Sequence, residues 1–149
     1  MAPRMKPGTM SREVFQAQLK LTMAAKEGLG DPNLAELVVL RASQLNHCAF
    51  CIDMHARNLR EAGESPERIA LLNAWEEATD HFTQRERAAL ALTEAVTVLT
   101  DGFVPDEVYA HAAAHFTETE LAHLLSVIVA INNWNRINAT LRMPPGELP

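Results

Sequence analysis

The stretch Asn46-His47-Cys48-Ala49-Phe50-Cys51-Ile52-Asp53-Met54-His55 contains the only two cysteines of the 149-residue chain. Residues three and four positions apart lie on one face of an α-helix, so Cys48, Cys51 and His55 would share a stripe. The Cα atoms of residues i and i+3 in a helix fall roughly within the 4.4–6.8 Å that a disulfide requires. This spacing predicts a thiol pair that can form and break a disulfide, with a base one turn away.

A helix that begins in this stretch would favour the thiolate form of a cysteine. Asn46 is a suitable N-cap, because its side-chain oxygen can accept a hydrogen bond from an orphan amide. The helix dipole stabilises negative charge in the first turn, where Cys48 is expected, whereas Cys51 lies deeper but close to His55. The dipole favours Cys48 as the attacking thiol and the histidine favours Cys51, and the residues alone leave this choice open.

Composition excludes several classes of function. The formal net charge of −6 argues against a nucleic-acid or anionic-membrane surface, since both need clustered Lys and Arg. The first residues have no apolar signal-peptide core, and no run of about 18 apolar residues predicts a membrane span. We therefore expect a cytoplasmic protein in a reducing compartment, where an isolated CxxC is catalytic or metal-binding more often than structural.

Caps and breaks along the chain predict an all-α protein of about seven or eight helices. We expect a single domain over residues 1–149, with an N-terminal arm at 1–10 and a C-terminal tail at 142–149. Expected N-caps are Ser11, Asn33 and Ser65, and capping boxes are expected to start at Thr83 and Thr117. The predicted helices cover approximately 12–26, 34–45, 47–62, 66–80, 84–99, 105–115 and 121–141.

The segment 121–137 is apolar around most of its circumference. A helix of this kind is buried, either in the core of its own chain or against other subunits, and the sequence leaves both open. Asn132, Asn133 and Asn135 interrupt the segment. Their amides need hydrogen-bond partners if they are buried.

Glu36 precedes Cys48 by twelve residues, on the helix before the CxxC helix. If the two helices pack as neighbours, its carboxylate could face His55 and orient it, as in a triad of nucleophile, base and orienting group. A glutamate also favours the first turn of a helix through the dipole alone. The physics of the sequence by itself favours this second interpretation.

The residues around the cysteine pair resemble the core motif of the AhpD-like alkylhydroperoxidases, within the carboxymuconolactone decarboxylase superfamily. The motif consists of a glutamate, a CxxC and a histidine after three further residues. Its positions are filled here by Glu36, Cys48, Cys51 and His55. The segments 70–75, 85–90 and 130–136 are also similar to small single-domain members, so the resemblance covers roughly residues 11–142.

The resemblance implies an AhpD-like helical bundle that assembles as trimers or hexamers, and an antioxidant, peroxiredoxin-type thiol peroxidase without cofactor or metal. In such proteins the second cysteine, here Cys51, attacks an organic hydroperoxide and becomes a sulfenic acid, which Cys48 resolves to a disulfide. His55 and Glu36 would relay protons. A lipoyl or thioredoxin-like dithiol would then reduce the disulfide by exchange.

Three other interpretations compete with the peroxidase. Cys48, Cys51, His55 and His47 could bind zinc, although one helical turn does not easily surround a tetrahedral ion. The superfamily also includes decarboxylases that lack the cysteine pair, and a disulfide can act as a redox sensor without turnover. Phe50, next to the pair, and Met54 either line a hydrophobic substrate pocket or pack in the core.

Overall fold

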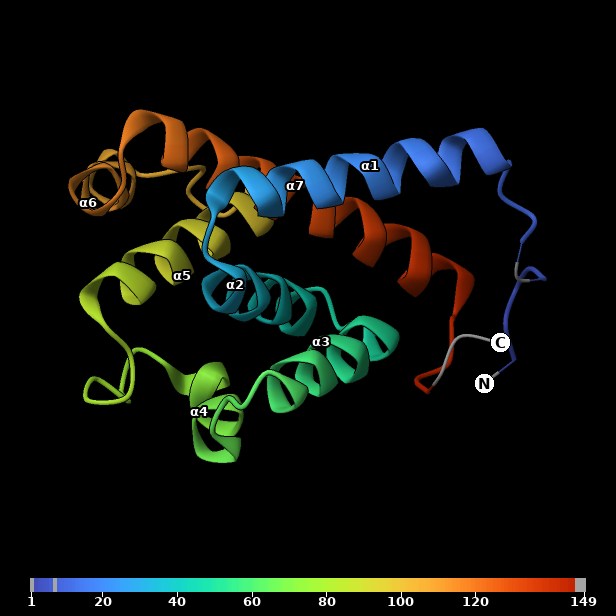
Figure 1. The fold of residues 1–149 in the computed structure, drawn as a ribbon, viewed down its shortest axis with the longest axis horizontal. Coiled ribbons are helices and arrows are strands. Elements are labelled where there is room, and N and C mark those ends of the chain that lie inside the picture. Colours follow the sequence, from blue (N-terminus) through green and yellow to red (C-terminus); the bar gives the residue numbers. More distant parts are fainter. Residues whose placement is uncertain (1, 7, 147–149) are drawn as a thin grey trace.

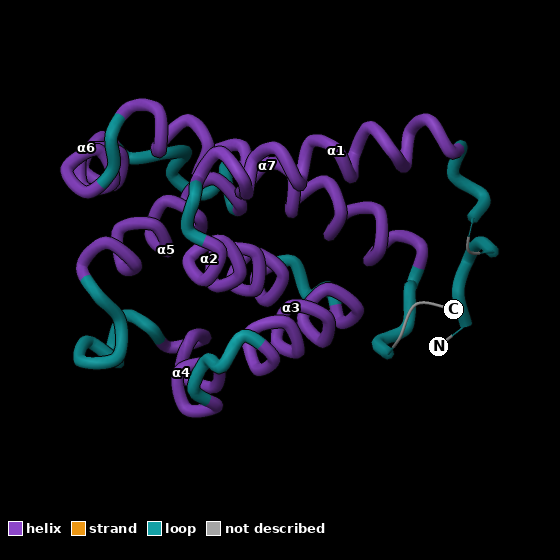
Figure 2. The backbone as a smooth tube through the Cα atoms, in the orientation of Figure 1, coloured by secondary structure: helices purple, strands orange, loops and turns teal. Residues whose placement is uncertain are grey.

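The computed structural model describes residues 2–6 and 8–146, and all the regular structure in these ranges is helical. Its elements, shown in Figure 1 and Figure 2, are α1 (Arg12–Leu29), α2 (Pro32–Leu45), α3 (Ala49–Glu61), α4 (Pro66–Leu71), the 3-10 turn η1 (Leu72–Ala74), α5 (Gln84–Thr97), α6 (Asp106–His115) and α7 (Glu118–Leu141). The predicted all-α class is confirmed. Within these ranges, no helix is both long and apolar enough to span a bilayer.

Local sequence signals set most helix starts. Ser11 and Ser65 cap α1 and α4 with their hydroxyls, and the capping boxes at Thr83 and Thr117 form as predicted. The N-cap of α2 is Asp31, whose Oδ1 accepts a hydrogen bond from Leu34 N at 3.1 Å, so the prediction of Asn33 is wrong. Pro32 then occupies the first turn, where its missing N–H costs nothing.

Helix ends differ more from the predictions. α1 continues through Gly28 to Leu29, because the left-handed residue that stops it is Gly30, with φ of 70°. Gly28 has a packing role instead: a Cβ there would lie 2.0 Å from the Cδ2 atom of His123 on α7. The predicted helix 66–80 is shorter, because α4 tightens into η1 and ends at Ala74.

α1 and α7 lie side by side and run in opposite directions along the longest axis of the molecule (Figure 1). The aromatic rings of Phe15 and Trp134 pack edge to face with centroids 5.5 Å apart. Nearby, Trp134 Nε1 donates to Thr22 Oγ1 at 2.9 Å, and Gln18 Nε2 donates to the Ala130 carbonyl at 3.2 Å. Polar bonds therefore fix the register of two helices that otherwise meet through apolar side chains.

α2 contributes side chains to two hydrophobic clusters, which lie on different sides of it. Its Val38 and Ala42 belong to a hydrophobic cluster with α1, α5, α6 and α7, whereas Leu37 and Leu40 belong to a second cluster with α3, η1 and α5. α7 contributes a deeply buried row that includes Ile128.

The far side of α7 is uncovered in this chain. Leu125 and Val129 are each 44% exposed. The alternative that this helix is buried wholly in the core of its own chain is therefore wrong. Covering of this face by other subunits stays a prediction.

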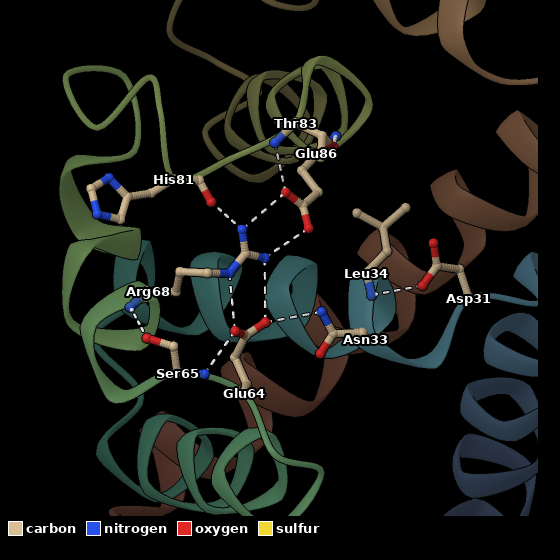
Figure 3. Close-up of polar contacts among 9 residues, drawn as sticks. All are labelled: Asp31, Asn33, Leu34, Glu64, Ser65, Arg68, His81, Thr83 and Glu86. Atoms are coloured by element: carbon tan, nitrogen blue, oxygen red, sulfur yellow. Dashed lines mark hydrogen bonds and ion pairs between the residues drawn. The ribbon is translucent and has the colours of Figure 1, made fainter.

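Arg68 of α4 joins the segment after α3 to the first turn of α5 through charged hydrogen bonds (Figure 3). Its guanidinium bonds Glu64 Oε1 at 3.0 Å and Glu86 Oε1 at 2.7 Å, and Glu64 also accepts from Asn33 Nδ2 at 3.0 Å. Burial raises the pKa of Glu64, but the hydrogen bonds from Asn33 and Arg68 outweigh it and lower that pKa. Glu86 is at the same time the closing residue of the α5 capping box with Thr83.

Arg68→Met should destabilise the protein, because it removes the shared partner of two carboxylates whose side chains are only 8% and 15% exposed. Breaking a largely buried ion pair costs about 3 kcal/mol. Urea unfolding measures this loss. The control is Arg60→Met, at an exposed residue of α3 that pairs with no described carboxylate, which should change stability by less than about 0.5 kcal/mol. Equal losses in both variants would contradict the role given to Arg68.

Candidate active site

The cysteine pair lies at the sharp corner between α2 and α3. Asn46 ends α2, His47 adopts a left-handed conformation with φ of 52°, and Cys48 is the N-cap of α3. The Cys48 sulfur accepts a hydrogen bond from Cys51 N at 3.4 Å. The prediction that Asn46 caps the CxxC helix is therefore wrong, and α3 starts two residues later than expected.

Asparagines of α7 hold this corner in place. Asn46 Nδ2 donates to Asn132 Oδ1 at 3.0 Å and to Asn135 Oδ1 at 2.9 Å, so its side chain is directed to α7 and not to the first amides of α3. Asn135 Nδ2 in turn donates to Ser43 Oγ at 3.0 Å. The buried amides of Asn132 and Asn135 have the partners that burial requires, whereas Asn133 lies on the exposed side of the helix.

Cys48 and Cys51 are joined by a disulfide, and their Cα atoms are 5.3 Å apart. The i, i+3 spacing therefore brings the thiols together as predicted. Because α3 begins at Ala49, Cys51 lies in its first turn and not a turn deeper. The helix dipole consequently acts at Cys51 as well as at Cys48, which removes the reason for preferring Cys48.

Asn138 is a site residue that the sequence analysis missed. Asn138 lies on α7, and its Nδ2 donates a hydrogen bond to Cys51 Sγ at a distance of 3.5 Å. A donor at this position stabilises negative charge on the sulfur. The signal was present in the sequence, because Asn132, Asn135 and Asn138 recur every three residues, so each one is a neighbour of the next on the helix surface.

Glu36 and His55 meet as hypothesised. His55 Nδ1 lies 2.8 Å from Glu36 Oε2, and Asn58 Nδ2 donates to the same oxygen at 3.4 Å. Lys26 of α1 forms an ion pair with the other carboxylate oxygen, a partner that no sequence pattern indicated. Glu36 lies beyond the first turn of α2, so the interpretation by helix dipole alone is wrong.

The electrostatics of this cluster keep Glu36 ionised. Burial raises its pKa, but the hydrogen bond and charge of His55, followed by those of Lys26, lower it from 4.5 to about 2. An ionised carboxylate at Nδ1 holds the Nδ1–H tautomer of His55 and leaves Nε2 as the site that exchanges a proton. His55 Nε2 is buried and makes no hydrogen bond to a described residue.

A cavity of about 680 Å³ between α1, α3 and α7 leads to Cys51 and His55. Phe50 and Met54 both contribute to its wall, and they also pack with the two cysteines, so they serve the pocket and the core together. Cys48 is not part of the lining. Cys51 is therefore the cysteine nearer to the cavity, at its buried end.

Residues 2–6 and 8–146 contain no set of ligands that would support the zinc interpretation. No three side chains of His, Cys, Asp or Glu are grouped there in a way that could hold a metal ion. The acid–base groups Glu36 and His55 bind each other instead of a metal ion. The geometry is that of a buried thiol pair with a histidine that a carboxylate orients.

Comparison with known proteins agrees with this geometry. Residues 12–95 match the sequence profile of the carboxymuconolactone decarboxylase family. The chain belongs to this family. The crystal structure of ATU0492 from Agrobacterium tumefaciens, a protein of unknown function proposed to be an AhpD antioxidant defence protein, superimposes with a TM-score of 0.92 at 33% identity, over 99% of this chain and 100% of that one. The fold of this family member is therefore AhpD-like.

Two relatives extend the comparison. The uncharacterized protein YdfG of Bacillus subtilis (strain 168) is 36% identical over 141 residues, which are 95% of each chain. The alkyl hydroperoxide reductase AhpD of Solibacter usitatus (strain Ellin6076) is 42% identical over 53 residues, 36% of this chain and 29% of that protein. The likeness to a named reductase is thus local.

The low pKa of Glu36 predicts a pH-dependent contribution to the stability of this family member. Because the folded-state pKa is about 2 and the ordinary value is 4.5, the contribution is complete above about pH 4.5 and is lost as the pH falls towards 2. Glu36→Gln should lower the free energy of unfolding at neutral pH by on the order of 3 kcal/mol. The difference from the wild type should shrink below pH 4.5 in urea unfolding experiments.

The matched control is Glu61→Gln, at an exposed residue at the end of α3. This variant should stay within about 0.5 kcal/mol of the wild type throughout the pH range. A constant difference between Glu36→Gln and the wild type at all pH values would show that the charge of Glu36 does not stabilise the fold.

The hydrogen bond from Asn138 to Cys51 predicts an effect on thiolate reactivity. In a Cys48→Ser background, Asn138→Ala should slow alkylation of reduced Cys51 by iodoacetamide at neutral pH by about threefold to tenfold, the worth of one hydrogen bond. Asn133→Ala, on the exposed side of the same helix, should leave the rate unchanged. Identical rates in both variants would mean that Asn138 does not act on the sulfur.

Proposed function

We propose that this protein is an antioxidant thiol peroxidase that reduces organic hydroperoxides through its Cys48–Cys51 pair. The observation that carries the proposal is that Cys51 and His55 both line one apolar cavity, while Glu36 holds the other side of the imidazole. Burial, a tuned carboxylate and a base beside a sulfur are the features of an activated nucleophile. The named function of the Solibacter relative supports the same chemistry.

The proposed cycle begins with Cys51 as a thiolate, its proton taken up at His55 Nε2. The thiolate sulfur attacks the outer peroxide oxygen, the O–O bond breaks, and the alkoxide leaves with the proton that His55 returns, forming an alcohol. Cys51 is thereby oxidised to a sulfenic acid. The Cys48 thiol then attacks this sulfur, forms the disulfide and releases water. Glu36 stabilises the charged imidazole between these two proton transfers.

An external dithiol would complete the cycle by two thiol–disulfide exchanges, which return the pair to thiols and leave the reductant as a disulfide. Cys48 and Cys51 are 1% and 0% exposed. This burial favours a reductant on a slender arm, such as a lipoyl group, over a thioredoxin-like protein that presents its thiols on a broad surface. No cofactor or metal takes part in these steps.

The proposal includes a homo-oligomer, a trimer or hexamer, located in the cytoplasm. The apolar residues Leu125 and Val129 on the outer face of α7 support association, because a second copy of the chain would remove them from water. The proposal includes no nucleic-acid or membrane partner, which agrees with the net charge of −6.

Cys51→Ser should reduce the consumption of tert-butyl hydroperoxide, with dihydrolipoamide as reductant, to the uncatalysed rate. Cys48→Ser should still undergo a single oxidation, because the attacking sulfur remains, but it should not recycle. In the wild type, peroxide without reductant should remove both thiols of each chain. Peroxide loss by absorbance and thiol titration measure these outcomes, with circular dichroism to show that both variants are folded.

Full activity in Cys51→Ser would overturn the assignment of the attacking cysteine. Oxidation of both thiols without catalytic turnover, with every dithiol tried, would favour a redox sensor. Stable thiols in the presence of peroxide would direct the search towards the decarboxylase-like chemistry of other family members.

A further inference from the structure

The pocket at Cys51 has walls that are apolar along its length and charged only by cations. Among the described residues, its lining contains no aspartate or glutamate but includes Lys6, Arg12 and Lys26. The whole chain has 19 acidic and 13 basic residues, so acidic side chains predominate in the chain but are lacking from the described lining of the pocket. This charge distribution selects against cationic ligands and favours anionic ones.

The three cations differ in availability. Lys26 is occupied by Glu36 at the end of the pocket where His55 lies. Lys6 and Arg12 are exposed and form no ion pair with another described residue. Arg12 precedes Lys26 by fourteen residues on α1, which places the two about 21 Å apart along the helix axis at 1.5 Å per residue. The available positive charge is therefore remote from the reacting end.

The N-terminal arm is fixed beside this remote end. Arg4 N donates to the Leu141 carbonyl at 2.9 Å, and the Arg4 guanidinium donates to the Thr140 carbonyl at 3.2 Å. In Figure 1 the arm accordingly lies across the end of α7. Because the start of α1 packs beside the end of α7, Lys6 of the anchored arm lines the pocket at the same end as Arg12.

The stretch between the two ends offers hydrocarbon contacts. Phe15 and Leu19 of α1 line it and are 46% and 40% exposed, and Trp134, whose ring packs against Phe15, and Leu141 line it from α7. Large apolar side chains left this open to water gain from a ligand that covers them, by about 25 cal/mol per Å² of area buried. An extended chain rises about 3.4 Å per three bonds, so the twelve bonds from the carboxyl carbon to C13 of an eighteen-carbon hydroperoxide would span roughly 14 Å, and the long, exposed side chains of Lys6 and Arg12 extend towards the carboxylate.

We propose that the preferred substrate is a long-chain hydroperoxide that carries a carboxylate, a fatty-acid hydroperoxide, with its carboxylate at Lys6 and Arg12 and its peroxide at Cys51. This assignment rests on the peroxidase function proposed above. The oxygen transfer is the same, so the product is the corresponding hydroxy fatty acid and the dithiol supplies the two electrons. The hydrocarbon lies along Phe15, Leu19 and Trp134.

The kinetic test compares linoleic acid hydroperoxide with its methyl ester, which has the same chain and peroxide but no charge. Below the micellar concentration and at low salt, kcat/KM should favour the acid by about tenfold, since each exposed charge contact contributes a few-fold and is screened by salt. The ratio of acid to ester should approach one in Lys6→Gln/Arg12→Gln. The control Lys20→Gln/Arg60→Gln removes the same charge from exposed positions outside the pocket and should keep the wild-type ratio.

A binding test separates the ligand class from the chemistry. Calorimetry of the oxidised protein should show that laurate binds about tenfold more tightly than dodecyltrimethylammonium, and that the preference is lost in Lys6→Gln/Arg12→Gln. Turnover of tert-butyl hydroperoxide with no preference for laurate, or for the acid over the ester, would overturn this inference alone. Selective binding of laurate without turnover of any hydroperoxide would overturn the proposed function, and with it the assignment of the ligand as a peroxide.

Discussion

The carboxylate of Glu36 is the group on which the arrangement of the first three helices depends. It lies on α2 with its side chain only 15% exposed, and its partners come from α1 through Lys26 and from α3 through His55 and Asn58. A buried carboxylate without partners would cost several kcal/mol, so displacing either neighbouring helix would be unfavourable. The same contacts that join the helices also orient the imidazole beside Cys51. One charge therefore both joins the three helices and orients the imidazole.

The corner between α2 and α3 is held by a second polar network that is satisfied at each buried amide. Asn46, Asn132, Asn135 and Ser43 exchange hydrogen bonds across the α2–α7 contact, and Asn138 continues the row to the Cys51 sulfur. Apolar side chains could pack these helices at similar distances, but they would not specify one position of the corner. Directional bonds do, because only one arrangement satisfies all the amides. The disulfide thus forms at a fixed place next to the pocket.

The parts of the fold that sequence patterns predicted are those that depend on neighbours in the chain. The hydroxyls of Ser11, Thr83 and Thr117 cap helices through bonds that span three residues, so their roles can be recognised locally. Asn46 was assigned to a cap by the same rule, and the rule failed because its side chain binds residues 86 and 89 positions away. The pairing of Glu36 with His55 was only the less favoured interpretation on helix physics, and the family pattern was what favoured it. Nothing local marked Lys26.

The departures from local preference gather in one region. His47 takes a left-handed conformation, Glu36 carries a buried charge, His55 Nε2 is buried without a described partner, and Phe15 leaves an apolar ring half exposed in the pocket wall. Elsewhere the described chain departs less from ordinary rules: Phe103, between α5 and α6, is also left-handed, but the chain there has capped helices, two hydrophobic clusters and an ion-paired Arg68. A fold selected for stability alone would have no reason to concentrate these costs beside its two cysteines. Their coincidence with the CxxC motif is independent of any family comparison, and it argues that the residues around the pocket are arranged for a function of this site and not for stability alone.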